Sequence, residues 1–359
     1  MNRLKTIVVK VGTNVISTPE GMIDHALLKA LVNQLVNLKA SGYSVILVSS
    51  GAVGAGKAAM RIPYRTNKVV QRQVYSAVGQ IKLMNFYDNL FNESDLHCAQ
   101  ILATKEDFRD RNHYLNMKSC FKGLLRDEII PIVNENDVTS VTELMFTDND
   151  ELAGLIASML NAEKLVILTN VDGVFNGHPD DSESQLIKEI DPDPEKVKSF
   201  ITPVKSSFGR GGMLTKIAIA QKLSKIGIST YIANGKNPEV LSDIAAEKNP
   251  GTLIRSSKKL SNLKKWMAFQ EGGEAGTVII NEGAKAALRS HDLVSSLLFV
   301  GIVNIEGDFK KHDIIRIIDE KNQNVGIGLA GISSEKAKKL IGKKGEKPLI
   351  HYNYLLINN

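Results

Sequence analysis

The segment Thr6-Ile-Val-Val-Lys-Val-Gly-Thr-Asn14 (TIVVKVGTN) joins a β-branched apolar run to a glycine turn. The run predicts a short buried strand, Thr6–Val11, because β-branched side chains pack well on a pleated surface. Apolar residues at helical spacing then predict a helix over Asp24–Ala40, and a second apolar run, Ser44–Val48, follows it. Buried strands that alternate with helices are typical of a mostly parallel sheet sandwiched by helices.

The same alternation continues to about residue 250. Further strands are predicted at Leu96–Leu102, Ile129–Val133, Leu165–Leu168 and Thr230–Ala233, and further helices at Glu151–Leu160 and Met213–Ile226. We therefore predict an α/β fold. In such folds ligands bind at the carboxyl ends of the strands, and the polar and glycine residues of this sequence fall there.

The last 85 residues follow a different pattern. Short predicted strands at Thr277–Ile280, Phe299–Val303, Ile314–Ile318 and Val325–Leu329 are separated by turn residues. This spacing indicates a small β-barrel-like domain with one or two helices. We predict a first domain over residues 1–254, a polar and basic linker over 255–274, and a second domain over 275–359.

The composition excludes several protein classes. The chain has 359 residues, of which 43% are hydrophobic and 23% charged, so it is neither disordered nor collagen-like. Its longest apolar runs fall far short of the ~20 residues of a membrane span. Cys98 and Cys120 support neither a disulfide framework nor a zinc site. We expect a cytoplasmic protein that makes no membrane contact.

The net charge of +6 is unevenly distributed. Residues 1–254 carry 28 basic and 28 acidic side chains, whereas residues 255–274 and 275–359 each carry a net charge of +3. A basic tail on a neutral body indicates a polyanion partner for the tail. A lysine-rich solvated surface explains the same numbers, and the sequence does not separate the two interpretations.

Two glycine segments follow this pattern of strand and helix. Gly51–Ala58 matches the start of a phosphate-binding P-loop but has Ala58 where Ser or Thr should bind Mg²⁺. We interpret it instead as a turn that presents Ser50 and Gly51 to a substrate carboxylate, or simply as a tight turn. Gly209–Lys216 opens a predicted helix, where backbone N–H groups and the helix dipole favour a polyphosphate.

Charged residues gather at the ends of the predicted strands. Lys10 lies within an apolar strand, which is costly without an anionic partner, although a lysine that reaches the surface would avoid the cost. Asn134–Asp137 follows one strand, and Thr147–Glu151 precedes a helix. Lysines, glycine turns and carboxylates together are the groups that phosphoryl transfer needs, because its catalysis is mostly positioning and charge neutralisation.

Six of these segments together resemble the amino acid kinase family, in the order in which the family has them: Lys10–Asn14, Val48–Gly56, Val133–Asp137, Phe146–Asp150, Leu168–Gly173 and Gly209–Lys216. Residues 275–359 resemble a PUA domain, a type that commonly binds RNA. The resemblance implies that the chain uses ATP and Mg²⁺ to phosphorylate the γ-carboxylate of L-glutamate, the first step of proline biosynthesis. It further implies feedback inhibition by L-proline and a homo-oligomer, either a dimer or a tetramer.

The resemblance also assigns roles to single residues. Lys10 and Lys216 would stabilise the transferring phosphoryl group, and Asp150 would orient both lysines. The acceptor would be bound by Ser50, Gly51, Asn134, Asp137, Asp148 and Asn149. ATP would be bound by Lys10, Thr169, Asn170, Gly211, Gly212, Met213, Leu214, Thr215 and Lys216. No side chain is assigned as a metal ligand.

Two residues depart from the family pattern. Asn170 stands where Asp is frequent, and Thr147 stands where Gly is usual. Two other functions remain open at this point: an RNA-binding protein in which the kinase fold is a scaffold, and a kinase for another small carboxylate.

Overall fold

In the computed structural model the chain divides into two compact units, Met1–Lys259 and Leu260–Asn359. The structure describes residues 5–18, 21–60, 67–139, 146, 148–191, 212–256, 267, 274–289 and 295–357. Most of the predicted linker over 255–274 lies outside these residues, so its boundaries stay a prediction. Among the described residues no helix is long and apolar enough to cross a membrane.

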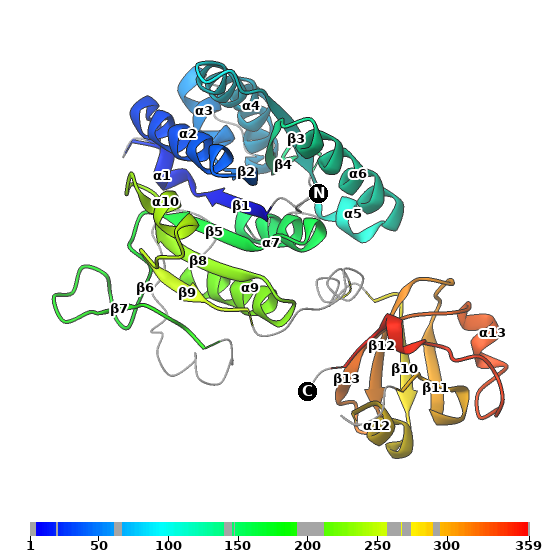
Figure 1. The fold of residues 1–359 in the computed structure, drawn as a ribbon. Coiled ribbons are helices and arrows are strands. Elements are labelled where there is room, and N and C mark those ends of the chain that lie inside the picture. The colour runs from blue at the N-terminus through cyan, green and yellow to red at the C-terminus, as the bar shows by residue number, and fades with distance from the viewer. Residues whose placement is uncertain are drawn as a thin grey trace. The chain divides into compact units, whose positions relative to one another are not determined.

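The first unit is built on a seven-stranded sheet in the order β3-β4-β2-β1-β5-β8-β9 (Figure 1). Every neighbouring pair is parallel except β8–β9, which is antiparallel. The strands are β1 (Lys5–Val11), β2 (Tyr43–Ser49), β3 (Cys98–Ala103), β4 (Ile130–Glu135), β5 (Lys164–Thr169), β8 (Ser229–Asn234) and β9 (Thr252–Ile254). A separate two-stranded ribbon pairs β6 (Val174–Phe175) with β7 (Leu186–Ile187).

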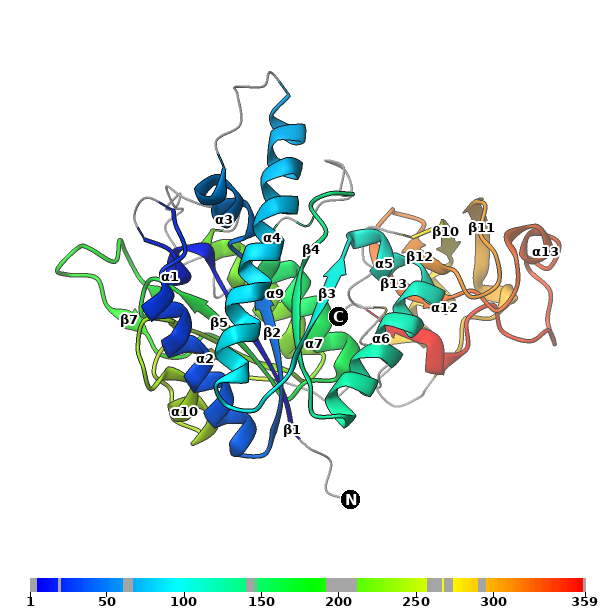
Figure 2. The same ribbon diagram turned by 90° about the horizontal axis from the view of Figure 1, so that it is seen from above.

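Helices pack on both faces of this sheet, as the sequence predicts. They are α1 (Thr13–Ile16), α2 (His25–Ala40), α3 (Ala52–Ala59), α4 (Lys68–Asn92), α5 (Lys105–Arg109), α6 (Arg111–Arg126), α7 (Asn149–Leu160), α9 (Met213–Lys225) and α10 (Val240–Ala245). Figure 2 shows α2 and α4 side by side across the strands. The apolar faces of α2, α4 and α10 form one core with the sheet.

Alternation along β1 decides what each of its faces meets. Ile7, Val9 and Val11 belong to the core under α2, α4 and α10. Because successive strand residues point to opposite faces, Val8 and Lys10 point to the other face, where α7 packs on β1 and α9 packs on α7. The strand therefore places one lysine on the α7 side of the sheet.

The predicted strands and helices of this unit are confirmed with boundaries shifted by at most a few residues. Asp24 caps α2 by accepting hydrogen bonds from the N–H groups of Ala26 and Leu27, which explains why the periodic pattern starts there. The 25-residue helix α4 is not among the predicted elements. It carries polar residues along much of its length, so its apolar periodicity is weak.

Glycine in the Gly51–Ala58 segment serves helix packing. A Cβ atom at Gly56 of α3 would overlap the backbone of Tyr75 in α4, and a Cβ atom at Gly79 of α4 would overlap the carbonyl oxygen of Ala52. The two helices thus approach closely because each presents a glycine to the other. This explains Gly56 without a phosphate-binding loop.

The second unit has a five-stranded sheet in the order β11-β10-β12-β13-β14. Its elements are β10 (Gly276–Ile280), α12 (Glu282–Arg289), the 3₁₀ helix η1 (Phe299–Gly301), β11 (Ile302–Gly307), β12 (Ile314–Asp319), β13 (Asn324–Leu329), α13 (Ser334–Lys338), η2 (Tyr352–Tyr354) and β14 (Leu355–Ile357). Only β10 and β12 pair in parallel. The predicted strand at Phe299–Val303 is wrong: Phe299–Gly301 is a 3₁₀ turn, and the strand runs from Ile302 to Gly307. An apolar run by itself does not separate the two conformations.

Replacing a glycine by alanine should have opposite effects on stability at the contact between α3 and α4 and at an open helix position. Gly79→Ala should lower the free energy of unfolding by about 1–3 kcal/mol, since the added methyl group overpacks the contact. Gly123→Ala, within α6, meets no atom within 4 Å and should raise it by about 0.5–1 kcal/mol through helix propensity. Thermal denaturation of both variants checks this, and equal shifts would contradict the packing argument.

Candidate active site

Three charged side chains meet on the α7 side of the sheet, and we call them the lysine–aspartate clamp. Lys10 Nζ of β1 lies 2.7 Å from Asp150 Oδ1, and Lys216 Nζ of α9 lies 2.7 Å from Asp150 Oδ2. The three residues are 6%, 8% and 0% exposed in the order Lys10, Lys216, Asp150. One carboxylate therefore fixes both ammonium groups in positions that neither lysine would keep alone.

The electrostatics of the clamp favour an additional anion. Burial by itself would raise the pKa of Asp150, but its ion pairs with Lys10 and Lys216 outweigh burial and hold that pKa below its ordinary value. Two positive groups then share one negative group, so the clamp by itself carries a net charge of +1 in a mostly buried place, and the neighbouring Asp148 carboxylate is a second anion that acts on both lysines. Such a charge is costly to bury without a further anionic partner.

Local sequence explains why Asp150 stands where it does. Asp148 is the N-cap of α7, and its Oδ1 accepts hydrogen bonds from the N–H groups of Asp150 and Glu151 at 2.9 and 3.0 Å. The cap starts the helix at Asn149, which puts Asp150 in the first turn. The helix dipole favours acidic residues in a first turn.

Asp148 itself is electrostatically strained. Burial first, and the charge of Asp150 second, raise its pKa from 3.8 to about 6, although the cap hydrogen bond and the two clamp lysines act in the opposite direction. Its Oδ2 atom is buried and accepts no hydrogen bond from any described residue. Asp148 thus offers one carboxylate oxygen beside the clamp.

A second network joins the strand ends next to the clamp. Asn149 Nδ2 lies 2.9 Å from Ser50 Oγ and 3.0 Å from Asn134 Oδ1, within donating distance of both, and it also reaches the carbonyl oxygen of Ser49. Asn134 Nδ2 donates to Gln80 of α4 at 2.9 Å. Four of the predicted acceptor-binding residues, Ser50, Asn134, Asp148 and Asn149, therefore lie together.

Gly51 is needed at the turn that follows Ser50. Its φ is +110°, a backbone conformation that residues with side chains rarely adopt, and it forms the N-cap of α3. A Cβ atom there would also lie 3.2 Å from Ile16 Cδ1. The turn ends β2 and leaves the Ser50 hydroxyl beside Asn149.

The sequence did not predict the contribution of α4. Arg72 Nη2 donates to Asp137 Oδ1 at 2.5 Å and lies 3.4 Å from Glu135 Oε2, and Ser76 Oγ donates to Asp137 Oδ2 at 2.9 Å. Arg72, Ser76 and Gln80 are spaced by four residues, so they lie on one face of α4. That spacing is the signal that could have found them.

The predicted nucleotide-binding residues end β5 and begin α9. Thr169 closes β5, and Asn170 follows it as an exposed residue. Gly212 is the N-cap of α9 without a side-chain hydrogen bond, followed by Met213, Leu214, Thr215 and Lys216. Gly211 and Thr147 lie outside the described residues. Among the described residues no hydrogen bond joins Thr169 or Asn170 to the clamp, so these assignments stay predictions.

A glycine beside the clamp leaves space at Lys10. A Cβ atom at Gly12 would lie 3.6 Å from Lys10 Nζ, so any larger side chain would compete with a ligand for the ammonium group. The N–H of Gly12 donates to the carbonyl oxygen of Leu168 at 3.3 Å. The ends of β1 and β5 are thereby held next to each other.

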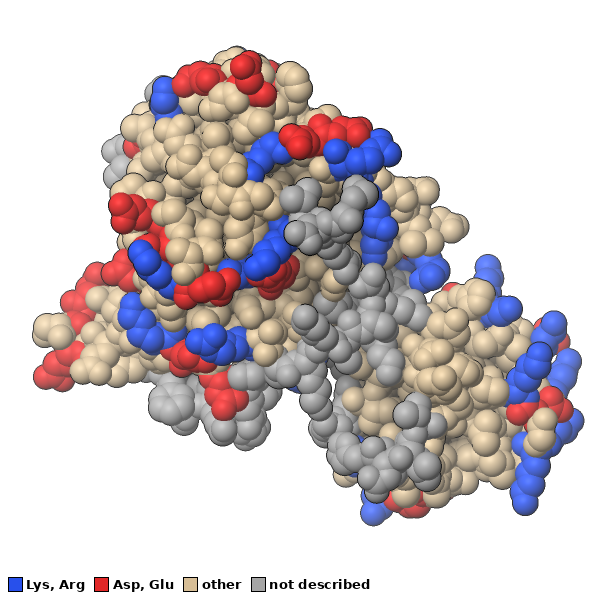
Figure 3. Space-filling model, in the orientation of Figure 1, with Lys and Arg blue, Asp and Glu red and all other residues tan. Residues whose placement is uncertain are grey.

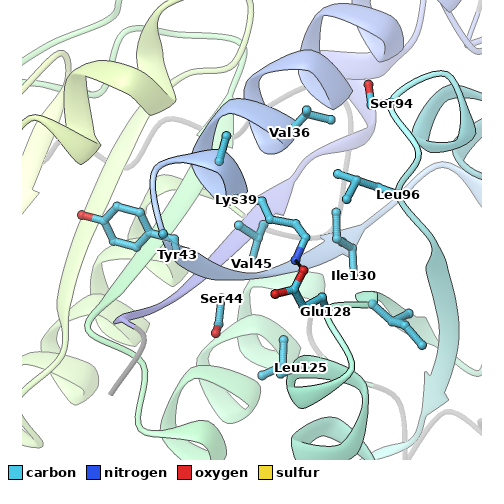
Figure 4. A pocket seen from close by; sticks show the side chains of 13 residues that line it. Val36, Lys39, Tyr43, Ser44, Val45, Ser94, Leu96, Leu125, Glu128 and Ile130 are labelled. Carbon is cyan, nitrogen blue, oxygen red and sulfur yellow. Dashed lines mark ion pairs between the residues drawn. The ribbon is translucent and has the colours of Figure 1, made fainter. Parts of the chain in front are cut away.

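A hollow of about 380 Å³ lies at the amino-terminal ends of β2 and β4, opposite to the carboxyl ends of the strands (Figure 4). Its charged residues, Lys39 and Glu128, pair with each other at 3.6 Å. None of the residues predicted to bind or react lines it. The predicted site residues of the first unit that the structure describes therefore lie away from this hollow.

Comparison with known proteins gives two domain matches. The model of the amino acid kinase family matches residues 5–234, and the model of the PUA domain matches residues 276–352. Among curated relatives, a glutamate 5-kinase of Chlorobaculum tepidum is 49% identical over 98% of this chain and 97% of its own length. One of Bacteroides thetaiotaomicron is 47% identical over 98% of both chains.

Solved structures agree on the fold of the first unit. A carbamate kinase from Giardia lamblia superposes with a TM-score of 0.53 at 18% identity, covering 72% of this chain and all of its own. An isopentenyl phosphate kinase gives 0.51 at 18% identity, covering 70% of this chain and all of its own. At such low identity the likeness concerns the fold alone.

The raised pKa of Asp148 predicts a stability gain on removing its charge. Asp148→Asn keeps an N-cap acceptor but removes a carboxylate that the fold disfavours, so the free energy of unfolding at pH 7 should rise by roughly 1–2 kcal/mol. The folded protein binds this proton more tightly than the unfolded chain does. The native enzyme therefore loses this stability as pH rises from about 4 to 6, and the gain of the variant should vanish below pH 4.

Asp24→Asn is the matched control, because Asp24 caps α2 with the same hydrogen-bond pattern at a half-buried position outside the clamp. Chemical denaturation of both variants at pH 4 and pH 7 makes the measurement. A gain for Asp148→Asn that is equal at both pH values would contradict the electrostatic explanation.

Proposed function

The chain belongs to the amino acid kinase family, and we propose that it transfers the γ-phosphoryl group of ATP to the γ-carboxylate of L-glutamate. The product is L-glutamyl 5-phosphate, the first intermediate of proline biosynthesis. The support is that curated relatives named glutamate 5-kinase are 47–49% identical over almost the whole chain. The catalytic roles below rest on the geometry of the site.

The lysine–aspartate clamp is the observation that carries the mechanism. A transferring phosphoryl group spreads negative charge over its oxygens, and stabilisation of that charge is the main catalytic effect available to a protein. Lys10 and Lys216 supply two ammonium groups, and Asp150 holds each at 2.7 Å. Their positions are fixed before the substrate binds, so little reorganisation accompanies the reaction.

The acceptor needs alignment rather than activation. A glutamate side chain has a pKa of about 4.3 and is ionised at pH 7, so no general base is required. An oxygen of the γ-carboxylate forms the bond to phosphorus, while the bond to the β-phosphate oxygen breaks and ADP leaves. We assign Ser50, Asn134 and Asn149 to holding the acceptor in line, helped by the N–H of Gly51 and by Asp137.

We assign the nucleotide to the start of α9 and the end of β5. The N–H groups at Gly212–Thr215 belong to the first turn of a helix, where anions are favoured. Thr169 and Asn170 would contact the nucleoside part of ATP, and Gly211 would contact its phosphates. Asn170 keeps hydrogen-bonding capacity but carries no charge.

The site is compatible with Mg²⁺ that enters with the nucleotide. Mg²⁺ usually binds one or two carboxylates and completes its shell with phosphates and water. Asp148 Oδ2 has no hydrogen-bond partner among the described residues, and it is the carboxylate oxygen available for this purpose. The described residues contain no cluster of three or more potential ligands, so the ion would depend on the phosphates, whose charge it would neutralise.

The PUA domain supports RNA binding as a second function. Its α13 and the following loop expose Lys336, Lys338, Lys339, Lys343 and Lys344. Figure 3 shows blue side chains gathered on one side of this unit, with red acidic side chains among them. His351, Tyr352 and Tyr354 lie close together, with ring centroids 4.2 and 6.0 Å from His351. Exposed lysines and aromatic rings are the groups that single-stranded RNA contacts.

The remaining assignments follow from the same proposal. We infer that L-proline inhibits the enzyme, that the chain forms a homo-oligomer, and that it acts in the cytoplasm.

Trapping the product tests the proposed reaction directly. Purified protein with ATP and Mg²⁺ should form γ-glutamyl hydroxamate when hydroxylamine is present, only if L-glutamate is added, and L-proline should suppress it. Production of ADP without hydroxamate, in a folded protein that binds ATP, would contradict the proposal. The RNA-binding function would then be the next to measure.

Substitution of the clamp tests the mechanism. Lys10→Ala and Lys216→Ala should each lower kcat by about 10²- to 10³-fold, as loss of a group that stabilises transition-state charge does. Asn149→Ala should mainly raise the KM for L-glutamate. Lys57→Ala is the control, because this exposed lysine of α3 would be essential in a P-loop and should be dispensable here. A strong loss of kcat in Lys57→Ala would contradict the assignment of Gly51–Ala58.

A further inference from the structure

The first turns of α4 hold the segment that follows β4. Arg72 Nη2 donates to Asp137 Oδ1 at 2.5 Å, and Ser76 Oγ donates to Asp137 Oδ2 at 2.9 Å. Gln73 Nε2 donates to the carbonyl oxygen of Val138 at 2.9 Å. Asp137 is only 6% exposed. Both of its carboxylate oxygens accept hydrogen bonds from residues of α4.

Arg72 has more donors than this contact uses. Its Nη1 atom is buried and has no hydrogen-bond partner among the described residues. A guanidinium group presents its donors in a rigid planar fork, so Nη1 stands beside the nitrogen that binds Asp137. Leaving a buried donor of a charged group unsatisfied is costly, which indicates a role for Nη1 that the side chains of the described residues do not fulfil.

Arg72 Nη2 is shared by two carboxylates, Asp137 at 2.5 Å and Glu135 at 3.4 Å, at one end of the proposed acceptor site. Asp137 lies three residues after Asn134, which contacts Asn149, and Asn149 directly precedes Asp150 of the clamp. The reacting γ-carboxylate must lie near the clamp lysines. The other end of a short amino acid then extends along this network, away from the lysines.

We propose that Arg72 is a specificity-determining residue that binds the α-carboxylate of the acceptor, while Asp137 binds its α-ammonium group. This inference rests on the proposed function. Guanidinium groups bind carboxylates through paired, charge-assisted hydrogen bonds, and Nη1 supplies a donor for one. When Arg72 binds the substrate carboxylate, the hydrogen bond from Ser76 Oγ to Asp137 Oδ2 keeps Asp137 in position. The pair therefore matches the zwitterionic end of an α-amino acid.

The inference predicts how the enzyme discriminates between two acceptors. 4-Aminobutyrate keeps the ammonium group and the reacting carboxylate of L-glutamate but lacks the α-carboxylate. The wild-type enzyme should have a kcat/KM for L-glutamate at least about 10-fold above that for 4-aminobutyrate. In Arg72→Gln this preference should fall by about 10- to 100-fold, the effect of one charge-assisted hydrogen bond, and mainly through the KM for L-glutamate.

Two further variants separate recognition from structural support. Ser76→Ala loosens Asp137 but leaves the guanidinium group, so it should lower kcat/KM for both acceptors by the same factor. Arg72→Lys keeps a positive charge but loses the paired hydrogen bonds of a guanidinium group, so it should retain part of the preference that Arg72→Gln loses. Hydroxamate formation at acceptor concentrations far below KM gives every kcat/KM ratio.

The outcomes distinguish this inference from the function beneath it. A wild-type enzyme that forms no hydroxamate from L-glutamate would overturn the proposed function. A wild-type enzyme that uses both acceptors equally well would overturn the inference alone. The same holds if Arg72→Gln lowers both kcat/KM values by the same factor, or if Arg72→Met does so where Arg72→Gln does not fold.

Discussion

The two ion pairs of Asp150 are the interaction on which the first unit depends. A buried carboxylate between two buried ammonium groups is tolerated only if each ammonium nitrogen lies within hydrogen-bonding distance of a carboxylate oxygen. A misplaced group would leave an uncompensated buried charge. The two 2.7 Å contacts therefore connect β1, α7 and α9 at three defined side chains.

The strand order shows why those three elements are the ones that meet. β1 lies in the middle of the sheet between β2 and β5, so its carboxyl end is surrounded by other strand ends. α7 precedes β5, and α9 precedes β8, the next strand outward. Both helices pack on the same face of the sheet. Residues 10, 150 and 216 meet because β1 points Lys10 to the face of the sheet on which α7 and α9 pack.

The sequence predicts the parts of this arrangement that follow from strong local constraints. A lysine in an apolar strand, a glycine turn before a helix and an Asp-rich helix start each have few explanations. The structure places Lys10 in a buried ion pair, Gly51 in a left-handed turn and Asp150 in the first turn of α7. Arg72 could not be found in this way. It lies on a long polar helix, so its four-residue spacing from Ser76 is a weaker signal, which the tertiary contact of both residues with Asp137 then explains.

Where the sequence misleads, the competing physical reason is visible. Gly56 resembles part of a phosphate loop, yet its missing side chain is required by the backbone of Tyr75. The apolar run at Phe299–Val303 is divided between a 3₁₀ turn and a strand, because burial dictates apolar residues in both. Gly211 and Thr147 lie outside the described residues, so the assignments made for them rest on the family resemblance.

Three charged groups near the candidate site are incompletely compensated by the described residues of the protein. The clamp keeps a net positive charge, the Asp148 carboxylate has a pKa raised to about 6, and Arg72 Nη1 lacks a partner among the described residues. Each costs folding free energy, and each is relieved by a group of the opposite kind: a phosphoryl group, a cation and a carboxylate. A substrate pair consisting of a metal-bound nucleotide and an amino acid brings all three. The unfavourable electrostatics of the protein's own side chains therefore encode the charge pattern of what it binds, and stability is given up at the positions where binding restores it.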